Sequence, residues 1–198
     1  MKLPRTARQQ GFTMLEILVS LLIIVFGLLG MLGLQAQATV AEFESYQRGQ
    51  ALILAQDMID RINANRKAGL CYAFTDLASG APQLGAGSAT PVCAAAVGTP
   101  VTRAMATQDL NDWHEALRGA AERTGGATGT RVGTMLNARG CVSYDPLTQL
   151  YRVSVVWQGM SATFAPLGSC GINQYHASND GYRREVMIEF RMANLTAP

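Results

Sequence analysis

The chain has 198 residues, a formal net charge of +2 and 48% apolar residues, which fits one modest domain with additional segments. The charge is unevenly distributed. Lys2, Arg5 and Arg8 precede a long apolar run, and a chain cut after Gly11 would carry 2 − 3 = −1. Such a nearly neutral chain lacks the basic footprint of nucleic-acid-binding proteins, so we expect no nucleic-acid partner.

The apolar run extends over about 23 residues from Phe12 to Leu34, and residues 17–34 carry no charge. A helix of this length can cross roughly 30 Å of hydrocarbon, whereas a secretory signal peptide has a shorter apolar region. The preceding basic residues predict a cytoplasmic amino terminus and an exported remainder. Glu16 is unusual here, because a charged residue in a membrane helix costs about 2.5–3.5 kcal/mol near the centre and less near an end. It is therefore a functional candidate that needs a partner.

Residues 35–67 contain no proline, and apolar residues recur at spacings of three and four. We expect one helix from Phe12 to near Arg66, half in lipid and half packed on a soluble domain. Its apolar stripe is interpreted as core rather than as a binding face, and comprises Leu52, Ala55, Ile59 and Ile62.

Residues 68–106 are rich in Gly, Ala, Ser, Thr and Pro, and this composition predicts a loop. Residues 107–123 predict a second, short helix. His114 lies next to its apolar stripe, and we interpret it as an ordinary surface or edge residue because no second ligand follows at helical spacing. The stripe itself comprises Leu110, Trp113, Leu117 and Ala120 or Ala121.

Alternating apolar residues predict three or four mainly antiparallel strands packed on the long helix, and therefore an α+β fold. In residues 150–158, Tyr151, Val153, Val155 and Trp157 form the apolar face. Residues 159–182 are expected to form a loop. The predicted strands are Thr130–Leu136, Gly140–Tyr144, Leu150–Gln158 and Arg183–Met192.

The four cysteines, Cys71, Cys93, Cys141 and Cys170, all follow the apolar run. An even count outside the membrane predicts two disulfides in an oxidising compartment. Three pairings are possible, and we favour the sequential one, Cys71 with Cys93 and Cys141 with Cys170, because it closes the shortest loops. We expect no metal and no cofactor, because there is no CxxC and only two histidines. No GxSxG or HExxH motif supports an enzyme.

The stretch Gly11-Phe12-Thr13-Met14-Leu15-Glu16 resembles the processing site of type IV prepilins. The resemblance implies that a prepilin peptidase cuts after Gly11 and methylates the new amino terminus, Phe12. It also implies that Glu16 is retained and faces the terminal amine of a neighbouring subunit, or its own. A carboxylate and an ammonium attract strongly in a low dielectric, and each would be costly alone.

Several later segments resemble those of PilV-type minor pilins, also called type IV pilus modification proteins. The resemblance implies a pilin-like fold with a long amino-terminal helix, half transmembrane, on a small antiparallel sheet. It also implies a complex with other minor pilins that primes pilus assembly and lies at the pilus tip, with the major pilin and the inner-membrane assembly platform as further partners. Pilus biogenesis, twitching motility and adhesion are the implied functions. The segments are LILAQDMIDRINANR, DLNDWHEAL, GCVSYD and LYRVSVVWQG.

These interpretations give a leader at 1–11, a transmembrane half-helix at 12–34, an amphipathic half at 35–67 and a periplasmic domain at 68–198. The protein would be held in the inner membrane by a single span and then move to the pilus. A minor pseudopilin of type II secretion would share the leader and Glu16, and the four cysteines favour the pilus only slightly. A membrane-anchored enzyme is the third hypothesis.

Overall fold

The computed structural model describes residues 11–86, 91–119, 123–125, 130–131, 133, 135–176 and 179–193. Residues 1–10, most of the expected leader, lie outside this set. The chain divides into two compact units, Met1–Phe43 and Glu44–Pro198. Helix α1 (Met14–Ala64) contributes residues to both units, and its 51 residues confirm the prediction of one long helix.

In the second unit, α1 buries Gln47 and a row of apolar residues. The predicted stripe was correct for Ala55, Ile59 and Ile62 but wrong for Leu52, whose side chain is 45% exposed. The small residue Ala51, at the adjacent position, lies on the buried face instead. The buried residues of α1 are Gln47, Ala51, Ala55, Met58, Ile59 and Ile62.

The segment predicted to be a loop, 68–106, contains regular structure. After the short helix η1 (Arg66–Ala68), it holds α2 (Gly69–Tyr72), β1 (Leu84–Gly85) and the first turns of α3 (Pro100–Leu117). Helix α3 therefore begins seven residues before the predicted position. The hydroxyl of Thr99 accepts a hydrogen bond from the Thr102 N–H at 3.3 Å, and Pro100 occupies the first helical position. This Thr-Pro pair is a helix start rather than part of a loop.

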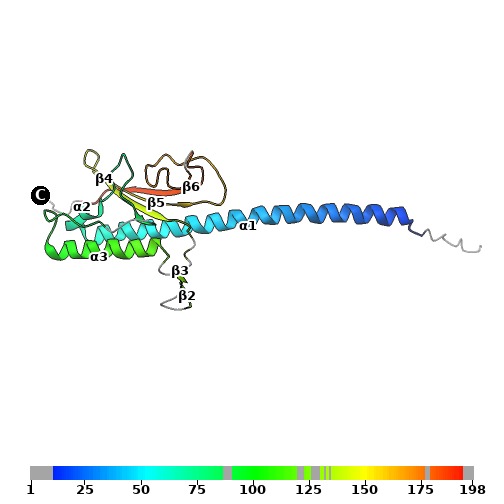
Figure 1. Ribbon diagram of the computed structural model, residues 1–198, viewed down its shortest axis with the longest axis horizontal. Helices are drawn as coiled ribbons and strands as arrows, with labels where there is room; N and C mark the ends of the chain where they lie inside the picture. Colours follow the sequence, from blue (N-terminus) through cyan, green and yellow to red (C-terminus); the bar gives the residue numbers. More distant parts are fainter. Residues whose placement is uncertain are drawn as a thin grey trace, which may run out of the picture. The chain divides into compact units, whose positions relative to one another are not determined.

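The main sheet has four antiparallel strands in the order β1-β4-β5-β6, with β4 at Arg139–Asp145, β5 at Leu150–Gln158 and β6 at Arg183–Phe190. Figure 1 labels β4, β5 and β6 of this sheet. Two-residue strands β2 (Arg123–Thr124) and β3 (Thr130–Arg131) pair separately. The predicted strand at 130–136 was too long, because residues 135 and 136 lie in a bend and a turn. Residues 132 and 134 are outside the described set, as are Ala120 and Ala121. The sheet and the long helix confirm the α+β, pilin-like fold.

One face of the sheet packs against α3 and the second-unit part of α1. Trp113 of α3 is fully buried, and its indole N–H donates to the Leu54 carbonyl oxygen at 2.9 Å. Trp157 of β5 is equally enclosed and donates to Gln47 Oε1 at 3.2 Å. Both tryptophans thus connect α1 to the rest of the core. Gly140 lies directly against the Trp113 ring, leaving no room for a side chain there.

The other face of the sheet is also covered, which the sequence pattern did not predict. The predicted inward residues of β5 are buried, but Ser154 and Val156 on the opposite face are buried too. The connection between β5 and β6 covers Val156, which lies in a second apolar cluster with Cys141, Cys170 and Tyr175. In the folded unit, both faces of the sheet are therefore packed against other parts of the chain.

Candidate processing and assembly site

Helix α1 begins at Met14, directly after Gly11, Phe12 and Thr13. The Thr13 hydroxyl accepts a hydrogen bond from the Glu16 N–H at 3.3 Å, so Thr13 occupies the N-cap position. Phe12 is 81% exposed, and among the described residues beyond its chain neighbours, no atom lies within 4 Å of the position a Gly11 side chain would occupy. The predicted cleavage site is therefore a short non-helical segment with open surroundings in front of a capped helix.

Glu16 lies in the first turn of this helix, on its exposed surface. Together with Thr13 it has the Thr-x-x-Glu spacing of a capping box, and an acid at a helix amino terminus is favoured by the helix dipole. Thr13 was not among the predicted site residues, although its spacing to Glu16 could have identified it as a cap. The carboxylate of Glu16 therefore has a local reason for its position besides the predicted pairing with a terminal amine, and that pairing stays a prediction.

The apolar part of α1 is uncovered by its own chain. Among the described residues, one helix, α1, is long enough and apolar enough to cross a membrane, judged by length and composition. Its most apolar window has a mean hydropathy of 2.8. Within the part of the chain that the structure describes, no atom outside the local helix backbone lies within 4 Å of side-chain positions at Gly27, Gly30 and Gly33. These glycines are therefore not required by packing against other described residues, and small residues of this kind permit close approach of membrane helices.

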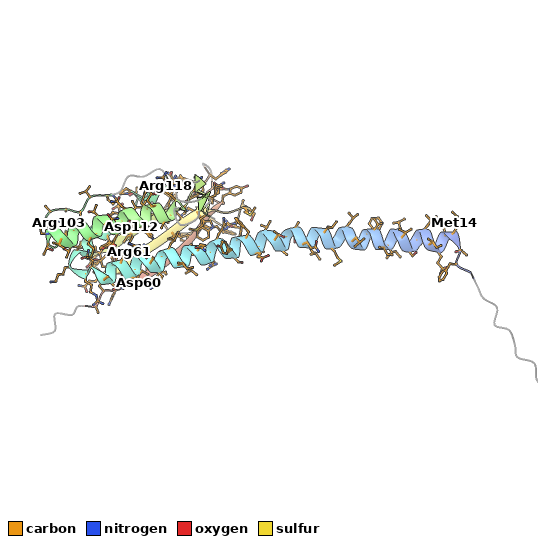
Figure 2. All side chains as sticks on the ribbon, turned by 90° about the horizontal axis from the view of Figure 1, so that it is seen from below. Met14, Asp60, Arg61, Arg103, Asp112 and Arg118 are labelled. Carbon is orange, nitrogen blue, oxygen red and sulfur yellow. A yellow bond between two sulfur atoms is a disulfide. The ribbon has the colours of Figure 1, made fainter. Side chains whose placement is uncertain are left out.

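In the folded unit, a polar network joins α1, α2 and α3. Arg61 of α1 donates to Asp109 Oδ1 of α3 at 3.1 Å and lies 3.7 Å from Asp112 Oδ2, the residue that Figure 2 labels on the neighbouring helix. The Tyr72 hydroxyl makes a short hydrogen bond to Asp109 and accepts one from Asn65 Nδ2 at 3.1 Å. Burial raises the pKa of Tyr72, and the Asp109 carboxylate raises it further. The network fixes the carboxyl end of α1.

The four cysteines form two disulfides, Cys71–Cys93 and Cys141–Cys170, which is the sequential pairing. The first attaches the segment before α3 to α2, and the second attaches the β5–β6 connection to β4. His114 is half-buried, and its Nδ1 accepts a hydrogen bond from the Gly85 N–H at 3.1 Å. It thus has a structural role at the edge of β1. Within the described part of the chain, no group of three or more potential ligands could hold a metal ion.

Two family models match the chain. Residues 6–32 match the prokaryotic N-terminal methylation motif, and residues 33–111 match the Tt1218-like family, described as type IV pilin Tt1218. No curated protein and no solved structure shows significant similarity to the chain.

A long apolar amino-terminal helix and a small antiparallel sheet are the architecture of a pilin, and both matches agree with it. The chain belongs to the type IV prepilin-like proteins. Its role is that of a pilin in pilus assembly, and the family is structural rather than enzymatic. The methylation motif implies processing by prepilin peptidase, and the apolar helix fits a membrane-anchored pilin.

Proposed function

We propose that the chain is a PilV-type minor pilin. The peptidase cuts between Gly11 and Phe12 and methylates Phe12, and the mature subunit joins other minor pilins in a complex that primes pilus assembly. The observation that carries this proposal is the methylation-motif match, which ends where the pilin match begins and includes Gly11, Phe12 and Glu16. The open, non-helical segment before the Thr13 cap supports a peptidase site at that position.

The proposed topology has residues 12–34 in the inner membrane and the folded unit in the periplasm. The two disulfides support an oxidising compartment for that unit. After assembly the subunit lies at the pilus tip, where it supports twitching motility and adhesion. Its partners are prepilin peptidase, other minor pilins, the major pilin and the assembly platform. In the assembled state, Glu16 pairs with a terminal amine, which gives its carboxylate a cation.

The minor status is tested by counting copies of the protein in purified filaments against the main subunit, by quantitative mass spectrometry, together with gold labelling of an epitope-tagged chain. We expect few copies and labelling at filament ends, and we expect fewer surface pili when the gene is deleted. An abundance equal to that of the main subunit would contradict the proposal. Normal piliation with defective protein secretion in the deletion strain would instead favour a type II secretion pseudopilin.

A further inference from the structure

Strand β6 lies at one edge of the four-stranded sheet and has β5 as its only neighbour there. The two strands pair residue by residue along all eight residues of β6, without a bulge. The Gly159 N–H donates to the Tyr182 carbonyl oxygen at 2.7 Å, which extends the same register by one more pair. The edge is therefore long and regular, and an edge of this kind is a template for a further strand.

Alternate residues of β6 direct their backbone groups away from β5. In an antiparallel pair, every second residue bonds with the neighbouring strand, and the residues between direct their N–H and C=O groups to the other side. Because Tyr182 bonds with Gly159, the even-numbered residues of β6 bond with β5. The residues that present backbone groups at the free edge are Glu185, Met187 and Glu189. Within the described part of the chain, no backbone hydrogen bond from another segment reaches these three residues.

The opposite edge of the sheet is occupied by the chain itself. The segment between α2 and α3 runs along β4, where the Thr75 N–H donates to the Val142 carbonyl oxygen at 2.9 Å. The Val142 N–H donates to the Thr75 hydroxyl at 3.2 Å, and β1 pairs with the start of β4. The outward backbone groups of β4 thus have partners within the fold, whereas those of β6 are left for water or for another chain.

The charges of β6 do little to protect this edge. Proteins commonly block an edge strand with lysine, proline or a bulge, and β6 contains none of the three. Arg183 is 2% exposed, and Arg184 pairs with Glu44 at 3.1 Å. Glu189 is bound by Arg152 at 2.6 Å. The charged side chains are therefore engaged within the fold, and the backbone edge beside them stays open.

The side chains of β6 define the chemistry of a strand that fits beside it. On the core face, Ile188 and Phe190 are half-buried and pack against the core, so an apolar residue opposite them would complete their cover. On the other face, Met187 is 45% exposed and Glu189 is half-exposed. The matching segment is extended, has apolar residues at alternate positions and carries no acid opposite Glu189, because like charges in directly opposed positions repel.

We infer that the free edge of β6 binds an extended segment of a different pilin subunit, which adds a fifth strand to the sheet. Backbone hydrogen bonds supply the affinity, and the apolar residues that face Ile188 and Phe190 supply the selectivity. The inference rests on the proposed function, because the partner is one of the minor pilins with which this chain assembles. A different subunit is favoured over a second copy because the proposed function expects few copies in a filament.

Met187→Pro tests the edge without removing a hydrogen bond of the folded chain. Proline lacks the outward N–H and obstructs a neighbouring strand, but it is tolerated on an edge strand where the N–H faces away from the sheet. Met187→Ala is the matched control, because it shortens the same side chain and keeps the N–H. Each full-length variant is immunoprecipitated from membranes in mild detergent, and the other pilin subunits that accompany it are quantified by mass spectrometry.

We expect Met187→Pro to reduce the recovery of other pilin subunits roughly tenfold or more, and Met187→Ala to change it less than about twofold, because only proline removes the outward donor. Equal recovery with the two variants would overturn the inference. If the unsubstituted chain brings down no other pilin subunit, that result contradicts the proposed function itself, and the inference with it.

Amide hydrogen exchange of the unsubstituted full-length protein, alone and in its purified complex, tests the inference even if Met187→Pro does not fold. In the isolated chain, the amides of Val186 and Ile188 should exchange slowly and those of Met187 and Glu189 rapidly, because only the first two bond with β5. In the complex, exchange at Met187 and Glu189 should slow roughly tenfold or more. Unchanged exchange in the complex would overturn the inference. Protection of Met187 and Glu189 in a preparation free of other subunits would also overturn it, since the edge would then be covered by this chain or by its second copy.

Discussion

The two halves of α1 differ in what covers them. In the first unit the large apolar residues from Phe12 to Leu34 are 48–83% exposed. In the second unit the apolar row from Ala51 to Ile62 is 0–7% exposed, because the sheet and α3 pack on it. One continuous helix therefore contains a self-sufficient half and a half that can be stabilised only by lipid or by other subunits. This contrast predicts that changes in the first half affect processing and assembly, whereas changes in the second half affect folding.

The largest effect is expected at the processing site. Gly11→Ala should nearly abolish cleavage, because the peptidase acts where this chain has no side chain. Folding should be unaffected, since Gly11 contacts nothing else in the described chain. An immunoblot for the unprocessed precursor measures the result. Gly27→Ala, which is equally uncrowded, is the control and should be cleaved normally; a shift to the mature band in Gly11→Ala would contradict the prediction.

Glu16→Ala should leave cleavage largely intact but reduce incorporation into filaments roughly tenfold or more, because losing one member of a desolvated ion pair costs about 3–5 kcal/mol. Glu16→Gln separates the two roles of this residue, since glutamine keeps the capping-box geometry but has no charge. We expect the amount of either variant in sheared filaments to be strongly reduced relative to the unsubstituted protein. Rescue by Gln would mean that the helix cap, rather than a pairing with the terminal amine, explains Glu16.

In the second unit, Arg183→Met should reduce the free energy of unfolding by about 3–5 kcal/mol, because it leaves the buried carboxylates of Asp180 and Glu185 without their cation. Arg152→Met removes the half-exposed pair with Glu189 and should cost less than about 1 kcal/mol. Denaturant titration of the full chain in detergent compares them. Similar losses for the two variants would show that the buried cluster has no special role.

Two neighbouring residues of α1 sharpen the contrast between covered and uncovered faces. Ala51→Leu places extra volume in a fully buried site and should cost about 1–3 kcal/mol. Leu52→Ala, on the face that is 45% exposed, should change stability by about 0.5 kcal/mol or less. If thermal unfolding ranked the two variants the other way, the assignment of the buried row would be wrong.

A small effect is expected at Tyr72→Phe, which should cost about 1 kcal/mol at neutral pH because Asp109 keeps its bond to Arg61 and Asn65 keeps its bond to Thr102. The raised pKa of Tyr72 in the folded state means that the unfolded chain loses this proton first. Stability should therefore fall as pH rises above about 10, the ordinary tyrosine value. The Phe variant should lose less over that range, and parallel curves would argue against the raised pKa.

The sequence predicted the elements that have strong periodicity and missed those that depend on capping or on tertiary cover. The long helix, β5 and the pilin-like fold follow from hydropathy and alternation. The early start of α3 was missed because Thr99 and Pro100 were interpreted by composition rather than as a cap and first turn. Burial of Val156 could not be predicted from alternation, because it arises from the connection between β5 and β6, which folds back on the sheet and is held by Arg183.

The candidate site shows the same division. Gly11, Phe12 and Glu16 are found by a local motif, and Thr13 could have been found by its spacing to Glu16. The exposure of Phe164 and Leu167, between β5 and β6, could not be predicted from the sequence. Only the fold shows that these two side chains are exposed while that of Tyr175 is buried.

Export, oxidation and prepilin processing each leave a mark on the mature chain. Intact mass and amino-terminal fragmentation of the membrane-extracted protein detect all three marks. We expect a chain that begins at N-methyl Phe12 and is lighter by four hydrogens for the two disulfides. A chain that still begins at Met1 would contradict it, and would leave Glu16 as a charge in an ordinary membrane anchor.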